Sequence, residues 1–197
     1  GGGHLTVDGH TFDLERNEKG VTTLHGGSTG TSVRNWRLDG YDRRSCILRV
    51  RHADGESGFP GNIDVTACYS LDDKGALWLD IEAAADAPTF CNLAHHSYWN
   101  LDGTADIASH RLTVRADSYL PVGDLLIPLG DPAPVAGTRF DYREMAPVLV
   151  ASGELLDHNF CLDRNGAGLA PACRLVAGGA CLDVSTTERG LQVYDGT

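Results

Sequence analysis

Residues 62–71 read NIDVTACYSL, and apolar and polar side chains alternate along the whole stretch. Strict alternation with period two is typical of a β-strand that buries one face. The turn-forming residues DDKG follow at 72–75, and the pattern then resumes at 76–83 (ALWLDIEA). Two such runs joined by a short loop with a glycine predict an antiparallel hairpin, with 63–70 paired to 76–83.

Short strands of the same kind are predicted along the rest of the chain. They lie at 5–7, 46–51, 111–116, 173–175 and 181–185. Helical signals are poor: residues 142–151 predict either a short helix or a loop, because Pro147 must sit in the first turn or break it. We therefore expect a single all-β domain over residues 1–197 with little helix, either a sandwich or a barrel.

The charge balance argues against several classes of partner. The chain has 16 Lys and Arg against 27 Asp and Glu, a formal net charge of −11. A surface this acidic repels nucleic-acid phosphates and anionic lipids. No apolar run approaches the roughly 20 residues of a membrane span. We therefore expect a small-molecule partner, no nucleic acid and no membrane, and a monomer or homodimer.

Six cysteines occur without any CxxC spacing, and we expect reduced, structural thiols rather than a disulfide framework. We also expect a cytoplasmic location. The chain begins GGGH without a Met start, which indicates an incomplete N-terminus and leaves a signal peptide open.

Three histidine-bearing motifs could carry chemistry. His25 lies in LHGG (24–27), where glycines let a ligand approach the backbone; the alternative is a plain glycine turn with an exposed His. His95 and His96 lie in NLAHHSYWNL (92–101). Adjacent residues on a strand face opposite sides, so at most one of the two can face a given pocket. The alternative is a polar strand end beside core aromatics.

The third motif is LDHNF (156–160), with Asp157 followed by His158. A carboxylate can accept hydrogen bonds from two sugar hydroxyls or orient a nearby imidazole. The alternative is an Asx turn with solvated side chains. A metal held by His25, His96 and His158 with Asp157 is not expected, because the usual ligand spacings are missing. No phosphate-binding glycine motif and no GxSxG nucleophile motif is present either.

Taken in order, these motifs resemble the aldose 1-epimerase (galactose mutarotase) family over essentially the whole chain. The matching segments are LHGG (24–27) with Trp36, GFPGN (58–62), NLAHHSYWNL (92–101), YLPV (119–122) with IP (127–128), PVAGT (134–138) with FD (140–141), DHNF (157–160) and TTERGLQVY (186–194). The resemblance implies a large antiparallel β-sandwich. It also implies interconversion of the α and β anomers of free aldohexoses such as glucose and galactose, with no metal or organic cofactor.

The resemblance also implies roles for individual residues. His96 occupies the position of the general acid, His25 and Asp157 fall on sugar-binding positions, and Gln192 falls on a Gln position near the pocket. Asn92 and Tyr98 are expected to shape the His96 strand rather than touch substrate. We expect the side chains of His25, His96 and Asp157 to converge around one cleft.

The sequence also departs from the family pattern. His95 stands where the family usually has Asn, Thr31 where an aromatic often follows, and Arg189 where it has Pro. The chain begins after the family's GRxANR arginine and stops before its catalytic Glu, so we expect an internal piece that is nearly inactive and poorly stable alone. If a base does lie within the chain, the candidates are Glu188 and, less favoured, Glu154.

Two other functions fit parts of the same evidence. A non-catalytic sugar-binding module or sensor would keep His25, Asp157 and Gln192 but would need no base. A hexose-6-phosphate epimerase relative would need an arginine cluster for the phosphate, and the sequence shows none.

Overall fold

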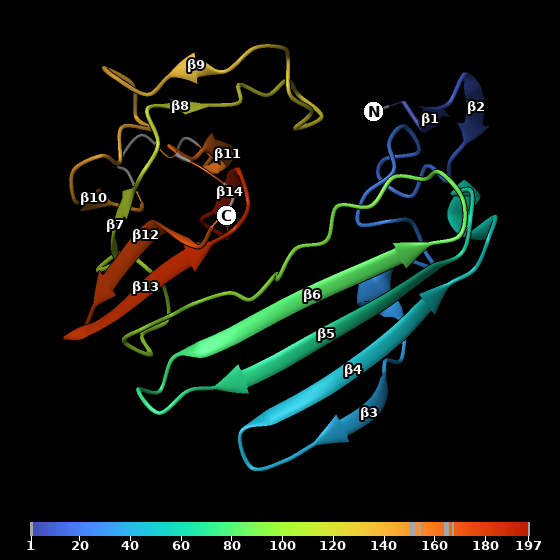
Figure 1. Cartoon of the computed structure of the whole chain (residues 1–197). Helices are drawn as coiled ribbons and strands as arrows, with labels where there is room; N and C mark the ends of the chain where they lie inside the picture. Colours follow the sequence, from blue (N-terminus) through green and yellow to red (C-terminus); the bar gives the residue numbers. More distant parts are fainter. Residues whose placement is uncertain (1, 150–152, 154, 164–165, 167, 197) are drawn as a thin grey trace. The chain divides into compact units, whose positions relative to one another are not determined.

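A computed structural model describes residues 2–149, 153, 155–163, 166 and 168–196 of the chain. The chain divides into two compact units, Gly1–His96 and Ser97–Thr197 (Figure 1). The described residues are nearly all strand and loop, and their helical content is two 3-10 turns, Thr31–Val33 and Glu56–Gly58. The predicted all-β class with little helix is confirmed, whereas a single domain over 1–197 stays a prediction.

The first unit is built on a four-stranded antiparallel sheet. Its spatial order is β3 (Arg37–Tyr41), β4 (Ser45–His52), β5 (Ile63–Leu71) and β6 (Leu77–Ala85) (Figure 1). A separate hairpin of β1 (His4–Val7) and β2 (His10–Asp13) precedes the sheet.

The predicted hairpin is confirmed as β5 and β6, which pair from Ile63↔Ala85 to Leu71↔Leu77. Its turn is held by Asp72, whose Oδ1 accepts the backbone N–H groups of Lys74 and Ala76, both at 2.9 Å. Burial along β5 is confined to the part far from this turn. Ile63, Val65 and Ala67 are buried, whereas Leu71 at the turn is 48% exposed.

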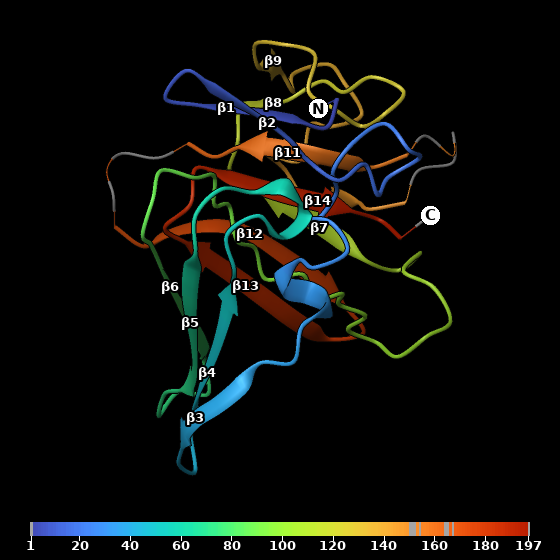
Figure 2. The ribbon, with the colours of Figure 1, turned by 90° about the vertical axis from the view of Figure 1, so that its right-hand side faces the viewer.

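The second unit contains two four-stranded antiparallel sheets. One has the order β10 (Ala146–Pro147), β7 (Arg111–Val114), β12 (Ala170–Ala177) and β13 (Ala180–Thr186). The other has the order β14 (Gly190–Tyr194), β11 (Asp157–Cys161), β8 (Ser118–Tyr119) and β9 (Ala133–Pro134). Figure 2 shows β12 beside β13 and β11 beside β14.

Both sheets of the second unit contribute to one apolar core, which is the packing of a β-sandwich. Its buried members are Leu112, Val114, Ala116, Val135, Tyr142, Val148, Leu156 and Phe160. Leu112 comes from β7 and Phe160 from β11, so the core lies between the two sheets. Alternation on β11 buries His158 and Phe160 and leaves Asp157 and Asn159 on the opposite face.

The five shorter predicted strands are also confirmed, within two or three residues at most ends, as β1, β4, β7, β12 and β13. The described part of 142–151 contains the two-residue strand β10 and no helix, while residues 150 and 151 lie outside the described residues. The prediction of a strand around His96 is wrong. Residues 89–100 form a loop without regular secondary structure between β6 and β7.

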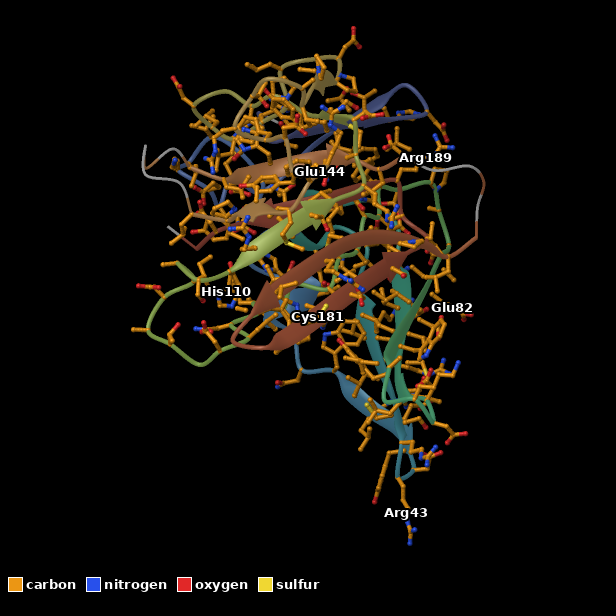
Figure 3. All side chains as sticks on the ribbon, turned by 90° about the vertical axis from the view of Figure 1, so that its left-hand side faces the viewer. Arg43, Glu82, His110, Glu144, Cys181 and Arg189 are labelled. Carbon is orange, nitrogen blue, oxygen red and sulfur yellow. The ribbon has the colours of Figure 1, made fainter. Side chains whose placement is uncertain are left out.

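All six cysteines are free thiols, as predicted. Cys91 and Cys181 are exposed, and Cys181 lies on β13 (Figure 3). Burial raises the pKa of Cys173 to about 11, which keeps this thiol protonated and unreactive at neutral pH. No helix among the described residues is long and apolar enough to cross a membrane.

His158 is a core residue rather than a ligand-facing one. Its ring packs against Tyr119 (centroids 5.7 Å apart) and Phe140 (4.3 Å), and its side chain is buried. Burial, helped by the nearby charge of Arg139, lowers the pKa of His158 below its ordinary 6.5. The backbone N–H of Asp157 donates to His158 Nδ1 (3.3 Å), which requires that nitrogen to be unprotonated.

We predict that His158 makes the folded state less stable in mild acid. As the pH falls below about 6.5, the unfolded chain gains a proton that the native His158 resists, so the free energy of unfolding decreases. In urea titrations at pH 7.5 and 5.5, His158→Phe should show a smaller decrease between the two pH values than the wild type. His10→Gln, which alters an exposed histidine on β2, is the control and should behave as the wild type. An equal pH dependence in the His158 variant would contradict the prediction.

Candidate functional site

The LHGG segment forms a tight loop with an unusual backbone. His25, Gly26 and Gly27 have φ values of +51°, +83° and +80°, so three successive residues adopt left-handed conformations. The loop is closed by hydrogen bonds from Gly27 N–H to the Leu24 carbonyl (3.0 Å) and from Gly30 N–H to the Gly27 carbonyl (3.2 Å). Glycine adopts such φ values without steric cost, whereas His25 does not, so this histidine is held in a strained position with its ring exposed.

The ring of His25 meets the ring of His96. Their centroids lie 5.2 Å apart with the planes at 82°, an edge-on contact between two exposed imidazoles. His95 points to a different neighbour, the ring of Tyr69 on β5, at 5.9 Å. The expectation that the two adjacent histidines have different surroundings therefore holds, even though they lie on a loop rather than on a strand.

The loop that carries His96 is anchored by an apolar side chain. Leu93 is partly buried and packs, together with Trp36, against the core of the first unit formed by Val50, Ile63 and Val65. His96 follows three residues after this anchor. Packing of Leu93, rather than strand pairing, therefore restrains the segment on which the candidate acid lies.

Asp157 and Gln192 form the second candidate pair, in the second unit. Strand β11 pairs with β14 so that Asp157 lies opposite Tyr194 and Asn159 opposite Gln192. Asp157 and Gln192 are therefore diagonal neighbours on one face of the sheet. The side-chain Nε2 of Gln192 donates to Asp157 Oδ1 at 2.6 Å. One such bond leaves a carboxylate able to accept further hydrogen bonds, for example from hydroxyl groups.

An aromatic pair extends the same face. The rings of Tyr98 and Tyr194 lie 6.0 Å apart with the planes at 74°. The expected role of Tyr98 and Asn92 in shaping a His96 strand is wrong, since no strand forms there, and the ring of Tyr98 packs on Tyr194 instead. Tyr194 was not predicted as a site residue. The sequence nevertheless indicates that Tyr194 lies beside Gln192. The two residues are two positions apart on one strand, and side chains at that spacing face the same side of a sheet.

The remaining candidates lie elsewhere. Glu188 is exposed in the turn between β13 and β14, where its backbone N–H donates to Thr186 Oγ1 at 3.0 Å. Glu154 lies outside the described residues. Among the residues that the structure describes, no three His, Cys, Asp or Glu side chains gather closely enough to hold a metal ion.

A groove in the second unit contains none of the predicted site residues. It measures about 530 Å³, lies on the β7–β12–β13 sheet, and is lined by residues that include Arg115, Cys173 and Arg174. The predicted residues instead form two pairs, His25 with His96 in the first unit and Asp157 with Gln192 in the second. Their convergence on a single cleft stays a prediction.

Comparison of the chain with known proteins assigns it to a family. The chain is 37% identical to a galactose mutarotase of Mus musculus over 201 residues, covering 98% of this chain and 58% of the relative. It is 35% identical to an aldose 1-epimerase of Escherichia coli K12 over 204 residues, covering 97% of this chain and 58% of the relative. The chain thus spans somewhat more than half the length of these curated relatives.

A solved structure shows the same fold. The crystal structure of an aldose epimerase homologue from C. elegans superposes with a TM-score of 0.90 at 26% identity, covering 98% of this chain and 61% of that one. The family model described as aldose 1-epimerase matches residues 1–197. The chain therefore belongs to the aldose 1-epimerase family.

Proposed function

We propose that the protein interconverts the α and β anomers of a free aldohexose of the glucose or galactose type. The observation that carries the proposal is the exposed contact between the imidazoles of His25 and His96. An imidazole is the side chain whose pKa is best suited to giving and taking protons near neutral pH. Two imidazoles with edge-on geometry at a solvent-accessible loop are therefore well suited to acid–base chemistry.

In the proposed reaction, His96 acts as the general acid. It donates a proton to the ring oxygen of the hexose while a base removes the proton of the C1 hydroxyl, so the C1–O5 bond breaks and an aldehyde forms. Rotation about C1–C2 and reclosure with the reverse proton transfers give the other anomer. The four predicted residues leave the base unassigned. His25, in contact with His96, would donate or accept a hydrogen bond at a sugar hydroxyl.

Asp157 and Gln192 bind the sugar in this proposal. Gln192 restrains one carboxylate oxygen of Asp157 through the 2.6 Å hydrogen bond, which limits the orientations that the carboxylate can adopt. A restrained carboxylate and an amide can together accept from and donate to vicinal hydroxyl groups. Because these hydroxyls do not change during ring opening, the bonds would be equally strong in the ground and transition states.

A sugar-binding module is the second candidate function. It is favoured by the group of Asp157, Gln192, Tyr98 and Tyr194, which suits hydroxyl and ring recognition and needs no proton transfer. A binding module would retain sugar affinity without catalysing anomer exchange. Turnover therefore separates the two functions.

We predict that His96→Ala in the complete gene product lowers kcat for mutarotation by a factor on the order of 10²–10⁴, because proton transfer to the ring oxygen is lost. Polarimetry of freshly dissolved α-glucose or α-galactose measures the rate. His95→Ala is the matched control, since His95 is adjacent but contacts Tyr69, and it should change kcat little. An unchanged rate in the His96 variant would exclude His96 as the acid.

We predict that Asp157→Ala acts chiefly through KM. Loss of a hydrogen bond to a charged group typically costs about 1.5–3 kcal/mol, which corresponds to a roughly 10- to 150-fold higher KM. Polarimetry over a range of sugar concentrations separates KM from kcat. Asp124→Ala, in an exposed loop, should leave both parameters at wild-type values. If the Asp157 variant instead lost kcat at constant KM, Asp157 would take part in the chemistry rather than in binding.

A further inference from the structure

The loop that bears His25 rests on the side chain of Glu15. A single carboxylate oxygen, Glu15 Oε2, accepts the backbone N–H of Ser28 (2.8 Å), the Ser28 hydroxyl (2.8 Å) and the Ser57 hydroxyl (3.0 Å). Gly27 lies so close to the side chains of Ser57 and Glu15 that a Cβ at this position would overlap both. The carboxylate therefore touches the loop two and three residues after His25.

Glu15 is itself fixed from two other directions. Its backbone N–H donates to the Ser57 carbonyl at 2.9 Å, and its carbonyl accepts the Thr23 hydroxyl at 2.8 Å. Thr23 precedes His25 by two residues. Glu15 thus holds the chain on both sides of His25, at Thr23 before it and at Ser28 after it.

The network continues beneath the loop. Ser57 Oγ lies 2.6 Å from Thr29 Oγ1, and Thr29 Oγ1 lies 3.5 Å from Nε2 of the buried His52. The hydrogen bonds from Ser28 N–H, Ser28 Oγ and Ser57 Oγ lower the pKa of Glu15, so the group is ionised at neutral pH. Hydrogen bonds to an ionised acceptor are stronger than those between neutral groups.

The His25 backbone needs such support. A residue with a Cβ is disfavoured at φ +51°, and two further left-handed residues follow it. Conformations of this kind persist only where the surroundings over-determine them, and they concentrate at functional sites. The ring of His25 leaves this strained backbone to meet His96.

We propose that Glu15 is a positioning residue for His25: its carboxylate holds the His25–Gly30 loop so that residues 25–27 keep the left-handed conformation that directs the His25 ring toward His96. The structural part of this inference stands on the hydrogen bonds of the first unit. Its kinetic consequence rests on the proposed function.

The first test is spectroscopic and needs no turnover. In the complete gene product, the imidazole signals of His25 are assigned by their loss in His25→Ala, and the nuclear Overhauser contact with the His96 ring is measured. Glu15→Ala should shift or broaden the His25 signals and weaken this contact. Glu15→Gln should restore both, since all three donors converge on one oxygen that an amide oxygen can replace. Glu82→Ala, on the edge strand β6 (Figure 3), is the control and should leave the signals unchanged.

The second test is a double-mutant cycle with mutarotation as the readout. Glu15→Ala should lower kcat/KM by about 10- to 100-fold, the effect of misplacing a substrate-contacting group by about 1 Å. In a His25→Ala background, the same change should cost less than about 2-fold, because the residue that Glu15 positions is already gone. Equal losses of kcat/KM in both backgrounds would overturn the proposal, since the effect of Glu15 would then not depend on His25.

Two outcomes keep the inference separate from the proposed function. If the wild type shows no mutarotation, the proposed function fails, and the His25 signals still decide the role of Glu15. If Glu15→Ala does not fold, Ser28→Ala replaces it, removing one hydroxyl donor and leaving the backbone donor in place. Unchanged His25 signals in whichever of these variants folds would overturn the positioning role.

Discussion

The alternation of side chains along β11 is the constraint on which the second unit depends. Successive residues of an antiparallel strand face opposite sides of the sheet, so one five-residue strand serves two purposes. His158 and Phe160 face the core, where Phe160 is fully buried, and Asp157 and Asn159 face the other way. A shift of one residue in the pairing with β14 would exchange these faces, placing Asp157 in the apolar core. Burial of Phe160 therefore also fixes the side on which Asp157 is presented.

The first unit positions its candidate residues differently. Neither His25 nor His96 lies on a strand. His25 is placed by a run of left-handed residues and by the carboxylate of Glu15, and His96 follows an anchor at Leu93. Loops commonly carry functional residues on a rigid scaffold. Here the scaffold is the β3–β6 sheet, and the loops depend on hydrogen bonds and packing rather than on ladder pairing.

Much of the fold and of the candidate site can be predicted from the sequence, because the signals involved are local. Period two over 62–71 and the Asp72–Gly75 turn predicted the β5–β6 hairpin, since both act between residues close in the chain. The candidates His25, His96, Asp157 and Gln192 came from ordered motifs, and family membership is confirmed. Free thiols were also predicted, from the chain length, the cysteine spacing and the positions of several cysteines in strand patterns.

Long-range contacts decided the rest. The two-residue strands β8, β9 and β10 form only because they pair with strands that are distant in the sequence. No local pattern therefore predicts them. The local pattern of residues 89–100 does not distinguish a strand from a loop. The conformation of this segment depends instead on the packing of Leu93 against the core of the first unit. Glu15 is 42 residues from Ser57, and Asp157 is 35 from Gln192. The local sequence determined which residues could form strands and carry chemistry, whereas the tertiary structure decided their partners, because hydrogen bonds and packing between distant segments form only once the chain is folded.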